Sequence, residues 1–295
     1  MELTYDNQGK FRIVQMTDLH LDSFSDNEND FKTLELIRNG LNTLEADLII
    51  ITGDLFWSKQ VTNPKDSLQT LYELLNDFKI PVAITYGNHD SESDYNREIV
   101  REAEKILTHH VEKKHSFVVD NKECYSIEIF SNDHKQLEHV IYIFDSGDYP
   151  KIRVSTYDWI HHQQIEWFNN LSAQYQRDLY GRRDLIFLHI PVPEYHLAKD
   201  NIINGVCEED GDIICSPEIN TGLFSAALIN DKVHSFYCGH DHDNNFCGEY
   251  KGIQLCYGQI TGYNAYGHLE RGFRIIDLDK SKITTKCITE KQIMN

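Results

Sequence analysis

The chain has 295 residues, 40% of them hydrophobic and 11% aromatic, which is enough to bury one large core. It has 28 Lys and Arg residues against 47 Asp and Glu residues, a net charge of −19. Because we find no basic cluster, this charge disfavours nucleic acid as a partner. No Pro/Gly/Ser-rich linker, low-complexity run or internal repeat divides the sequence, so we expect a single domain over residues 1–295 with its core at about 10–280.

Short β-rich runs alternate with amphipathic helical patterns near the start of the chain, as in βαβ units. We expect strands at 11–16, 48–51 and 81–86. Two helices lie between them, and Pro64 opens the second at a favoured first-turn position. The apolar residues that recur at helical spacing in these helices are Leu34, Ile37, Leu41 and Leu44, then Leu68, Leu71, Leu75 and Phe78.

The later strands are expected at 116–119, 125–130 and 140–144, with no room for helices between them, which indicates antiparallel or mixed pairing. A helix at 163–171, interpreted as docked on the core, precedes strands at 185–189, 233–237, 253–257 and 273–278. We therefore predict an α/β fold in which two mixed β-sheets pack as a sandwich flanked by helices.

Polar clusters follow five of these strands. Because the carboxyl ends of strands in α/β sheets form the ligand-binding crevice, clusters that are distant in sequence are expected to converge there. They are Asp18-Leu19-His20, Gly53-Asp54, Gly87-Asn88-His89-Asp90, His189 and Gly239-His240-Asp241-His242.

Each cluster alone has an ordinary structural interpretation, because a strand-end Asp often caps a helix and a lone His is usually a surface or core residue. Their joint occurrence favours a metal centre. Two divalent cations need about eight N and O ligands with one carboxylate shared between them, and the sequence supplies such a set.

The series DxH, GD, GNHD, a strand-end His and GHxH over residues 18–242 resembles the calcineurin-like metallophosphoesterase superfamily. Finer stretches resemble its branch of purple acid phosphatases and fungal phosphoprotein phosphatases: Phe144-Asp145-Ser146-Gly147, Tyr157-Asp158-Trp159-Ile160, His189 to Tyr195 and Gly239 to Gly248. The resemblance implies the four-layer αββα metallophosphoesterase fold and a metal-dependent phosphoric ester hydrolase.

The resemblance also implies a ligand set for two metal ions. Asp54 would bridge them, since one carboxylate presents two oxygens. One ion would be bound by Asp18, His20 and His242, and the other by Asn88, His189 and His240. Carboxylates and imidazoles without thiolate suit Mn, Fe or Zn.

The resemblance further implies that a metal-bridging water would lose a proton and that the resulting hydroxide would attack phosphorus in line. His89 matches the superfamily's site histidine, which would stabilise the transition state or protonate the leaving oxygen. Asp90 has two interpretations: it orients the His89 imidazole, or it caps the start of a helix.

One position departs from the purple acid phosphatases. Trp57 stands three residues after the bridging Asp54, where those enzymes have a metal-bound tyrosine, and His20 stands where they have no histidine ligand. We therefore predict no tyrosinate-to-iron charge-transfer colour. Trp57 either packs over the site mouth or is buried in the core.

The segment 258–268 also has two interpretations. Its Tyr263, Tyr266 and His268 line a substrate pocket, or the tyrosines only pack against the protein. His109-His110 and His161-His162 do not end strands and are expected to be exposed pairs.

The expected activity is a phosphomonoesterase acting on a phosphorylated small molecule or a phosphoprotein. A phosphodiesterase or nuclease with the same metal core, and a non-catalytic scaffold, are the alternatives. Seven cysteines without a CxxC pair favour reduced thiols over a disulfide framework. With neither a leader pattern nor an apolar run of about 20 residues, we expect a cytoplasmic protein without membrane attachment.

Overall fold

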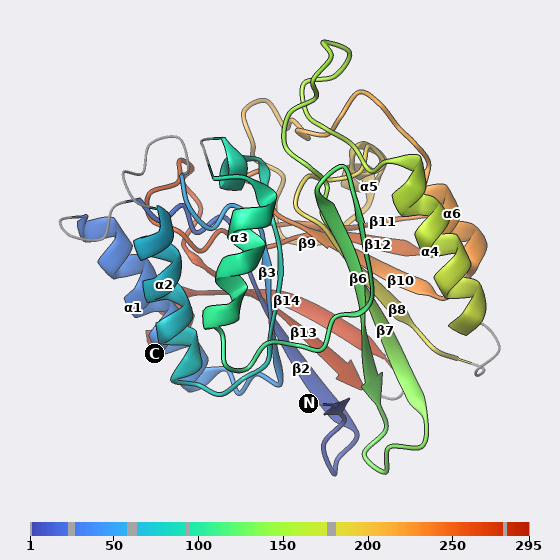
Figure 1. The fold of residues 1–295 in the computed structure, drawn as a ribbon, viewed down its shortest axis with the longest axis horizontal. Helices are drawn as coiled ribbons and strands as arrows, with labels where there is room; N and C mark the ends of the chain where they lie inside the picture. The colour runs from blue at the N-terminus through green and yellow to red at the C-terminus, as the bar shows by residue number, and fades with distance from the viewer. Residues whose placement is uncertain are drawn as a thin grey trace.

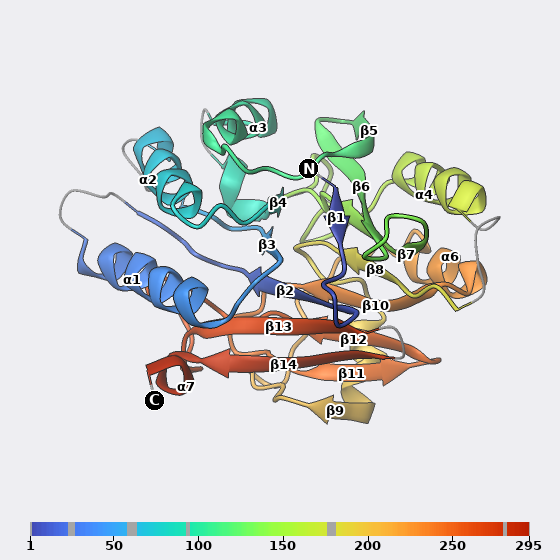
Figure 2. The ribbon, with the colours of Figure 1, turned by 90° about the horizontal axis from the view of Figure 1, so that it is seen from below.

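The computed structural model describes residues 2–22, 27–57, 64–92, 95–175, 181–279 and 282–294. Two β-sheets lie face to face and helices cover the outer side of each (Figures 1 and 2). One flank carries α1 (Glu28–Thr43), α2 (Pro64–Asn76) and α3 (Arg97–Ala103), and the other carries α4 (His162–Tyr175) and α6 (Leu223–Asn230). This arrangement confirms the predicted α/β sandwich flanked by helices.

The first sheet has five strands in the order β14-β13-β2-β3-β4. The parallel strands are β2 (Lys10–Met16), β3 (Leu48–Thr52) and β4 (Val82–Thr85), and α1 and α2 connect them along the chain. Strands β13 (Gly272–Asp279) and β14 (Ile283–Thr289) complete the sheet in antiparallel pairing. Because β2, β3 and β4 run the same way, the residues that follow them reach one common edge.

The second sheet has nine strands, in the order β1-β6-β7-β8-β10-β12-β11-β9 with β5 paired to β6. Strands β7, β8, β10 and β12 are parallel neighbours, so β8 and β10 also deliver their next residues to one edge. The bounds are β1 (Leu3–Thr4), β5 (Lys114–Val119), β6 (Lys122–Phe130), β7 (Leu137–Phe144), β8 (Asp184–Phe187), β9 (Ile202–Asn204), β10 (Val233–Cys238), β11 (Cys247–Tyr250) and β12 (Ile253–Tyr257).

Short helical segments occupy the remaining connections. They are η1 (Asn88–Ser91), η2 (Glu104–Ile106), α5 (Tyr195–Ala198) and η3 (Lys199–Asn201), while α7 (Glu290–Met294) follows β14 as the last element. The connection between β7 and α4 projects at the top of Figure 1.

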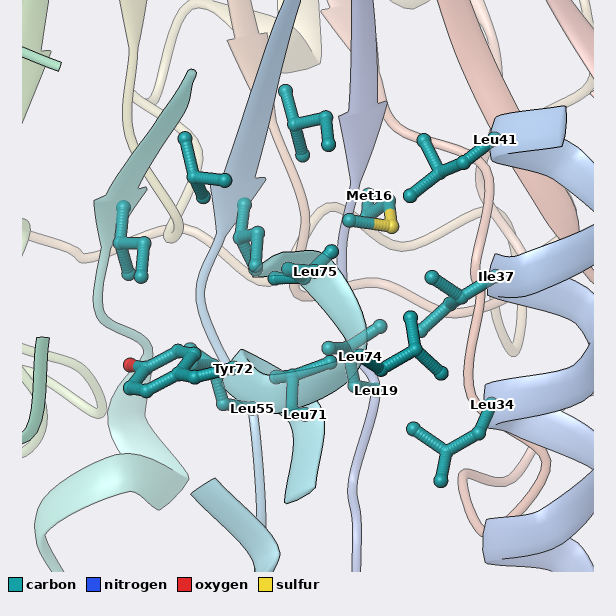
Figure 3. Close-up of a cluster of buried hydrophobic side chains, with 14 of the residues drawn as sticks. Met16, Leu19, Leu34, Ile37, Leu41, Leu55, Leu71, Tyr72, Leu74 and Leu75 are labelled. Atoms are coloured by element: carbon teal, nitrogen blue, oxygen red, sulfur yellow. The ribbon is translucent and has the colours of Figure 1, made fainter. Parts of the chain in front are cut away.

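Apolar side chains fill three layers. Alternation along β2 sends Ile13 into the layer between the sheets, whereas Val14 and Met16 face the helices. Figure 3 shows Leu34, Ile37 and Leu41 on α1 beside Met16. The third layer lies under α4 and α6 and includes Phe168 and Phe224.

The predicted strands and helices are present with shifts of a few residues at their ends. The prediction that Phe78 belongs to the buried face of the second helix is wrong, because α2 ends at Asn76 and the Phe78 side chain is only partly buried. The sequence patterns missed the polar edge strand β14 and the short helices α3 and α6, whose apolar repeats are too brief to stand out.

The expectation of reduced thiols is wrong for two of the seven cysteines. Cys247 and Cys256 face each other on the antiparallel strands β11 and β12, with their Cα atoms 3.9 Å apart, and form a disulfide. The other five, Cys124, Cys207, Cys215, Cys238 and Cys287, are free. None of the helices in the described ranges is long and apolar enough to cross a membrane.

Candidate metal centre

The predicted ligands converge between the carboxyl ends of the two sheets. Asp18 and His20 follow β2, Asp54 follows β3, and Asn88 follows β4 as the first residue of η1. The second sheet contributes the rest: His189 after β8, and His240 and His242 after β10. All seven side chains are buried. The structure therefore brings the whole predicted set together, and their roles as ligands stay a prediction.

Two groups of donor atoms form around the Asp54 carboxylate. Asp18, His20 and His242 make one group and Asp54, His189 and His240 the other, with ligand atoms within 4.8 Å of one another in each. Asp54 Oδ2 lies 3.6 Å from His20 Nε2 and 3.2 Å from His189 Nε2. One carboxylate oxygen therefore faces both groups, which fits the predicted bridging role of Asp54.

The remaining contacts tighten each group. His242 Nε2 lies 3.1 Å from His20 Nε2 and 3.4 Å from Asp18 Oδ1. Asn88 Oδ1 lies 3.2 Å from His189 Nε2 in the other group. Ring nitrogens and carbonyl or carboxylate oxygens thus meet at short range in a buried space.

The backbone of the site is held in an uncommon conformation. Asp18, His20, Asp54 and His240 have φ values of 54°, 45°, 51° and 82°, in the left-handed region that side chains with a Cβ seldom adopt. Such positions cluster at functional sites because the surrounding fold must hold them there. The backbone of Gly87 approaches the Asp54 side chain closely, since a Cβ at this residue would lie 2.1 Å from Asp54 Oδ1.

The donor set fits bound cations. His189 Nδ1 donates to the carbonyl of Thr52 at 2.7 Å, so in the neutral ring the Nε2 lone pair points at the Asp54 and Asn88 oxygens. A cation that displaces the Nε2 proton would be held by this nitrogen and by the Asp54 and Asn88 oxygens. Among the residues that the structure describes, the buried His240 Nε2 has no hydrogen-bond partner, which is costly unless a ligand occupies it.

The charges of the site favour the same conclusion. Burial lowers the pKa of the His20 and His240 imidazoles to about 3, which keeps both rings neutral. Burial alone would also lower the pKa of His189, but the negative charge of Asp54 outweighs it and raises the value to about 9. The Asp54 carboxylate therefore attracts positive charge to the point where the prediction places a metal.

Asp90 holds the loop that carries Asp54. Its carboxylate accepts backbone N–H groups of Gly87 at 2.7 Å, Asp54 at 2.9 Å and Leu55 at 2.8 Å. The contact with Gly87 caps the start of η1, which favours the capping interpretation over orientation of His89.

The carboxylate on the His89 imidazole belongs to Glu92. Glu92 Oε2 lies 2.8 Å from His89 Nδ1. The His89 backbone N–H donates to Asp54 Oδ1 at 2.9 Å, which fixes the residue at the metal centre. The sequence pattern did not single out Glu92, because only the turn η1 determines which of the two nearby acidic residues meets the imidazole.

Aromatic rings border the site on several sides. The Trp57 ring lies 4.1 Å from that of His20 and 4.3 Å from that of His89, so Trp57 packs over the site rather than in the core. Tyr157 meets His240 edge to face at 4.4 Å. The stretch Tyr157-Asp158-Trp159-Ile160 indicates the family in the sequence but gives no signal that Tyr157 contacts His240.

The two tyrosines of the segment 258–268 behave differently: one borders the site and the other only packs against the protein. The Tyr266 ring lies 4.0 Å from that of His242, and its hydroxyl donates to Glu209 at 2.8 Å, so this tyrosine borders the site. Tyr263 packs instead, with its hydroxyl on Glu290 at 2.5 Å. His268 lies at the surface between Glu208 and Asp243.

Comparison with known proteins identifies the class. A sequence model described as calcineurin-like phosphoesterase matches residues 11–244, and the chain therefore belongs to this family. It is 28% identical over 319 residues to probable inactive purple acid phosphatase 29 of Arabidopsis thaliana, with 95% of this chain and 80% of that protein covered.

Two further likenesses are informative. The chain is 29% identical to phosphatase DCR2 of Saccharomyces cerevisiae over 92% of its own length and 52% of that protein's. A solved dimetal phosphatase from Danio rerio superposes with a TM-score of 0.64 at 16% identity, covering 95% of this chain and 96% of that one. The second likeness shows the fold, and the family implies two metal ions.

Proposed function

We propose that this protein is a dinuclear metal-dependent phosphomonoesterase. The observation that supports it most directly is the position of Asp54, whose Oδ2 lies within 3.6 Å of a ring nitrogen from each group of donors. A scaffold that only binds other proteins has no need for seven buried metal-type side chains on a strained backbone. The burial and backbone strain of these side chains count against the non-catalytic alternative, although the name of the Arabidopsis relative calls it inactive.

The cations we propose are Mn, Fe or Zn, held by Asp18, His20 and His242 on one side and by Asn88, His189 and His240 on the other. When bound, they activate a water molecule at neutral pH and neutralise charge on the ester oxygens.

The chain's own residues complete the proposed chemistry. The His89 ring lies 5.3 Å from that of His20, beside the metal centre and partly accessible, so it can donate a hydrogen bond to a phosphate oxygen or a proton to the leaving oxygen. Trp57 limits its movement on one side and shields the site from water.

A small substrate or a phosphoprotein suits the charge better than nucleic acid does. The net charge is −19, and Glu92 and Glu209 add acidic groups beside the site. These charges repel the many phosphates of a nucleic acid but tolerate a single ester that the metals neutralise. We propose the cytoplasm as the place of action because five of the seven cysteines are free; the Cys247–Cys256 disulfide counts against a reducing compartment.

The test is a paired assay of 4-nitrophenyl phosphate and bis(4-nitrophenyl) phosphate with Mn²⁺. We expect the monoester to turn over at least about tenfold faster, and Asn88→Ala to abolish turnover of both. Faster hydrolysis of the diester would instead identify a phosphodiesterase. An inactive metal-loaded protein, or an Asn88→Ala variant as active as the parent, would contradict the proposal.

A further inference from the structure

Four side chains form a continuous path beside the metal centre, made of two hydrogen bonds and one contact at ion-pair distance. Asn88 Nδ2 lies 2.9 Å from the Tyr149 hydroxyl, and that hydroxyl lies 3.4 Å from Glu92 Oε1. The other oxygen of Glu92 lies 2.8 Å from His89 Nδ1. The path therefore begins at a predicted metal ligand and ends at the residue expected to act on the ester.

The donors and acceptors along the path permit one consistent arrangement. The Asn88 amide nitrogen can only donate, so the Tyr149 hydroxyl accepts from it and donates its own proton to Glu92. This arrangement turns Asn88 Oδ1 toward His189 Nε2, at 3.2 Å, which is the side of the metal group. Tyr149 thus determines which end of the Asn88 amide faces the metal.

Glu92 holds one edge of the imidazole. Its Oε2 lies at ion-pair distance from His89 Nδ1, 2.8 Å, so the other ring nitrogen, Nε2, lies on the side away from Glu92. The two side chains are 21% and 13% exposed, so water screens their attraction less than it would on an open surface. The Trp57 ring at 4.3 Å packs against the imidazole and restricts its rotation.

We infer that Glu92 and Tyr149 are positioning residues of the active site, an inference that rests on the proposed phosphatase function. Glu92 orients His89 toward the leaving oxygen, and Tyr149 couples that orientation to the amide of Asn88. In the reaction, a water oxygen bonds to phosphorus and its proton passes to solvent. The ester P–O bond breaks with its electron pair on the leaving oxygen, which receives a proton from His89.

This role predicts a dependence on the leaving group. Phenyl phosphate has a basic leaving oxygen that needs the proton, whereas 2,4-dinitrophenyl phosphate has one that departs without it. With Mn²⁺-loaded protein, Glu92→Ala is expected to lower kcat for phenyl phosphate by about 100-fold, the lower end of the range for a positioned acid, and to change kcat for the dinitrophenyl ester only a few-fold. The control is Glu98→Ala, which removes an exposed carboxylate of α3.

Tyr149→Phe tests the other half of the path, because it keeps the ring and removes the hydroxyl. It is expected to show the same leaving-group pattern and also to weaken Mn²⁺ binding about tenfold, since it loosens a ligand. The Glu92→Ala/Tyr149→Phe double variant is expected to lose less than the product of the two single losses, because both residues act on one path.

Tungstate, a phosphate mimic, provides a readout that does not depend on turnover. Calorimetry of Mn²⁺-loaded protein is expected to show about tenfold weaker tungstate binding in Glu92→Ala and unchanged binding in Glu98→Ala. If the parent hydrolyses no ester, the proposed function fails and tungstate affinity alone decides the positioning role. Equal kcat losses for both esters, multiplicative losses in the double variant, or unchanged tungstate binding in Glu92→Ala would each overturn the inference.

Discussion

Asp54 Oδ2 and His189 Nε2 lie 3.2 Å apart, although Asp54 follows a strand of the five-stranded sheet and His189 a strand of the nine-stranded sheet. The metal centre is therefore also a junction between the two halves of the sandwich. If these side chains bind metal as proposed, ligands from both sheets would couple metal binding to the stability of the whole fold.

Asp54→Asn tests the shared carboxylate. The amide has nearly the same shape but carries no charge, so we expect bound Mn²⁺ to fall from about two ions to fewer than one per chain. Activity is expected to fall at least about 100-fold, since loss of a residue that only hydrogen-bonds to a metal ligand already costs about 10–100-fold. Elemental analysis and the 4-nitrophenyl phosphate assay measure both effects. The control is Asp77→Asn, an exposed carboxylate paired with Arg38, which should retain metal and activity.

Removal of metal is expected to destabilise the protein. A ligand at 100 times its Kd stabilises a native state by about 2.7 kcal/mol, and an empty site also leaves His240 Nε2 buried without a partner. Thermal unfolding with EDTA should therefore show a Tm several degrees below that with Mn²⁺. In Asp54→Asn the two curves should nearly coincide. Identical Tm values for the parent protein in EDTA and in Mn²⁺ would mean that the site binds no metal in the folded state.

Gly87→Ala is expected to damage the site through contact alone. The new Cβ would lie 2.1 Å from Asp54 Oδ1, while the backbone at Gly87 is not in the left-handed region. We predict a loss of about 1–3 kcal/mol in the free energy of unfolding, typical of overpacking, together with weaker Mn²⁺ binding. Gly252→Ala is the matched comparison, because its φ of +83° strains an alanine while no atom lies within 4 Å of the new Cβ. It should lose stability and keep its metal affinity, and equal Mn²⁺ affinities in the two variants would argue against the contact.

The sequence predicted the ligand set because five polar clusters follow strands that it also predicted. Because the carboxyl ends of parallel strands share one edge of a sheet, residues such as Asp18 and His240 could be expected to lie close together from the sequence alone. The edge strand β14 lay beyond this reasoning, since only one of its faces packs and its sequence is largely polar.

Contacts between loops could not be predicted in the same way. Acidic residues at 90 and 92 both follow His89 closely, and only the tight turn η1 determines that Asp90 caps backbone amides while Glu92 meets the imidazole. Tyr149 lies in a long connection whose path depends on the whole fold, so its contact with Asn88 had no local signal.

The iron-loaded protein is expected to lack the visible charge-transfer band of a tyrosinate ligand. Trp57 occupies the position of that tyrosine, and its ring packs at a tilt against the His20 and His89 rings. An indole N–H is a donor only and cannot bind a metal as a phenolate does. Visible absorption spectroscopy after reconstitution with Fe³⁺ should show no such band, and a purple product would indicate that another tyrosine reaches the metal.

His139 predicts a pH-dependent stability that is independent of the metal centre. Burial lowers its pKa from 6.5 to about 4, and its Nε2 accepts the Tyr5 hydroxyl at 2.5 Å while Nδ1 donates to the Arg183 carbonyl. Between these pH values the unfolded chain binds a proton that the folded protein does not, so stability falls as pH drops from about 6.5 to 4. The slope from this residue is at most about 1.4 kcal/mol per pH unit. Urea unfolding of His139→Gln over this range should show a shallower slope than the parent, and an unchanged slope would contradict the assignment.

Anomalous diffraction from crystals grown with Mn²⁺ tests the dinuclear centre most directly. We predict two peaks about 3.5–4 Å apart, the spacing of known two-metal sites. One should lie among Asp18, His20 and His242, the other among Asn88, His189 and His240, and both should lie within bonding distance of Asp54. A single peak, or two peaks that Asp54 does not join, would contradict this assignment.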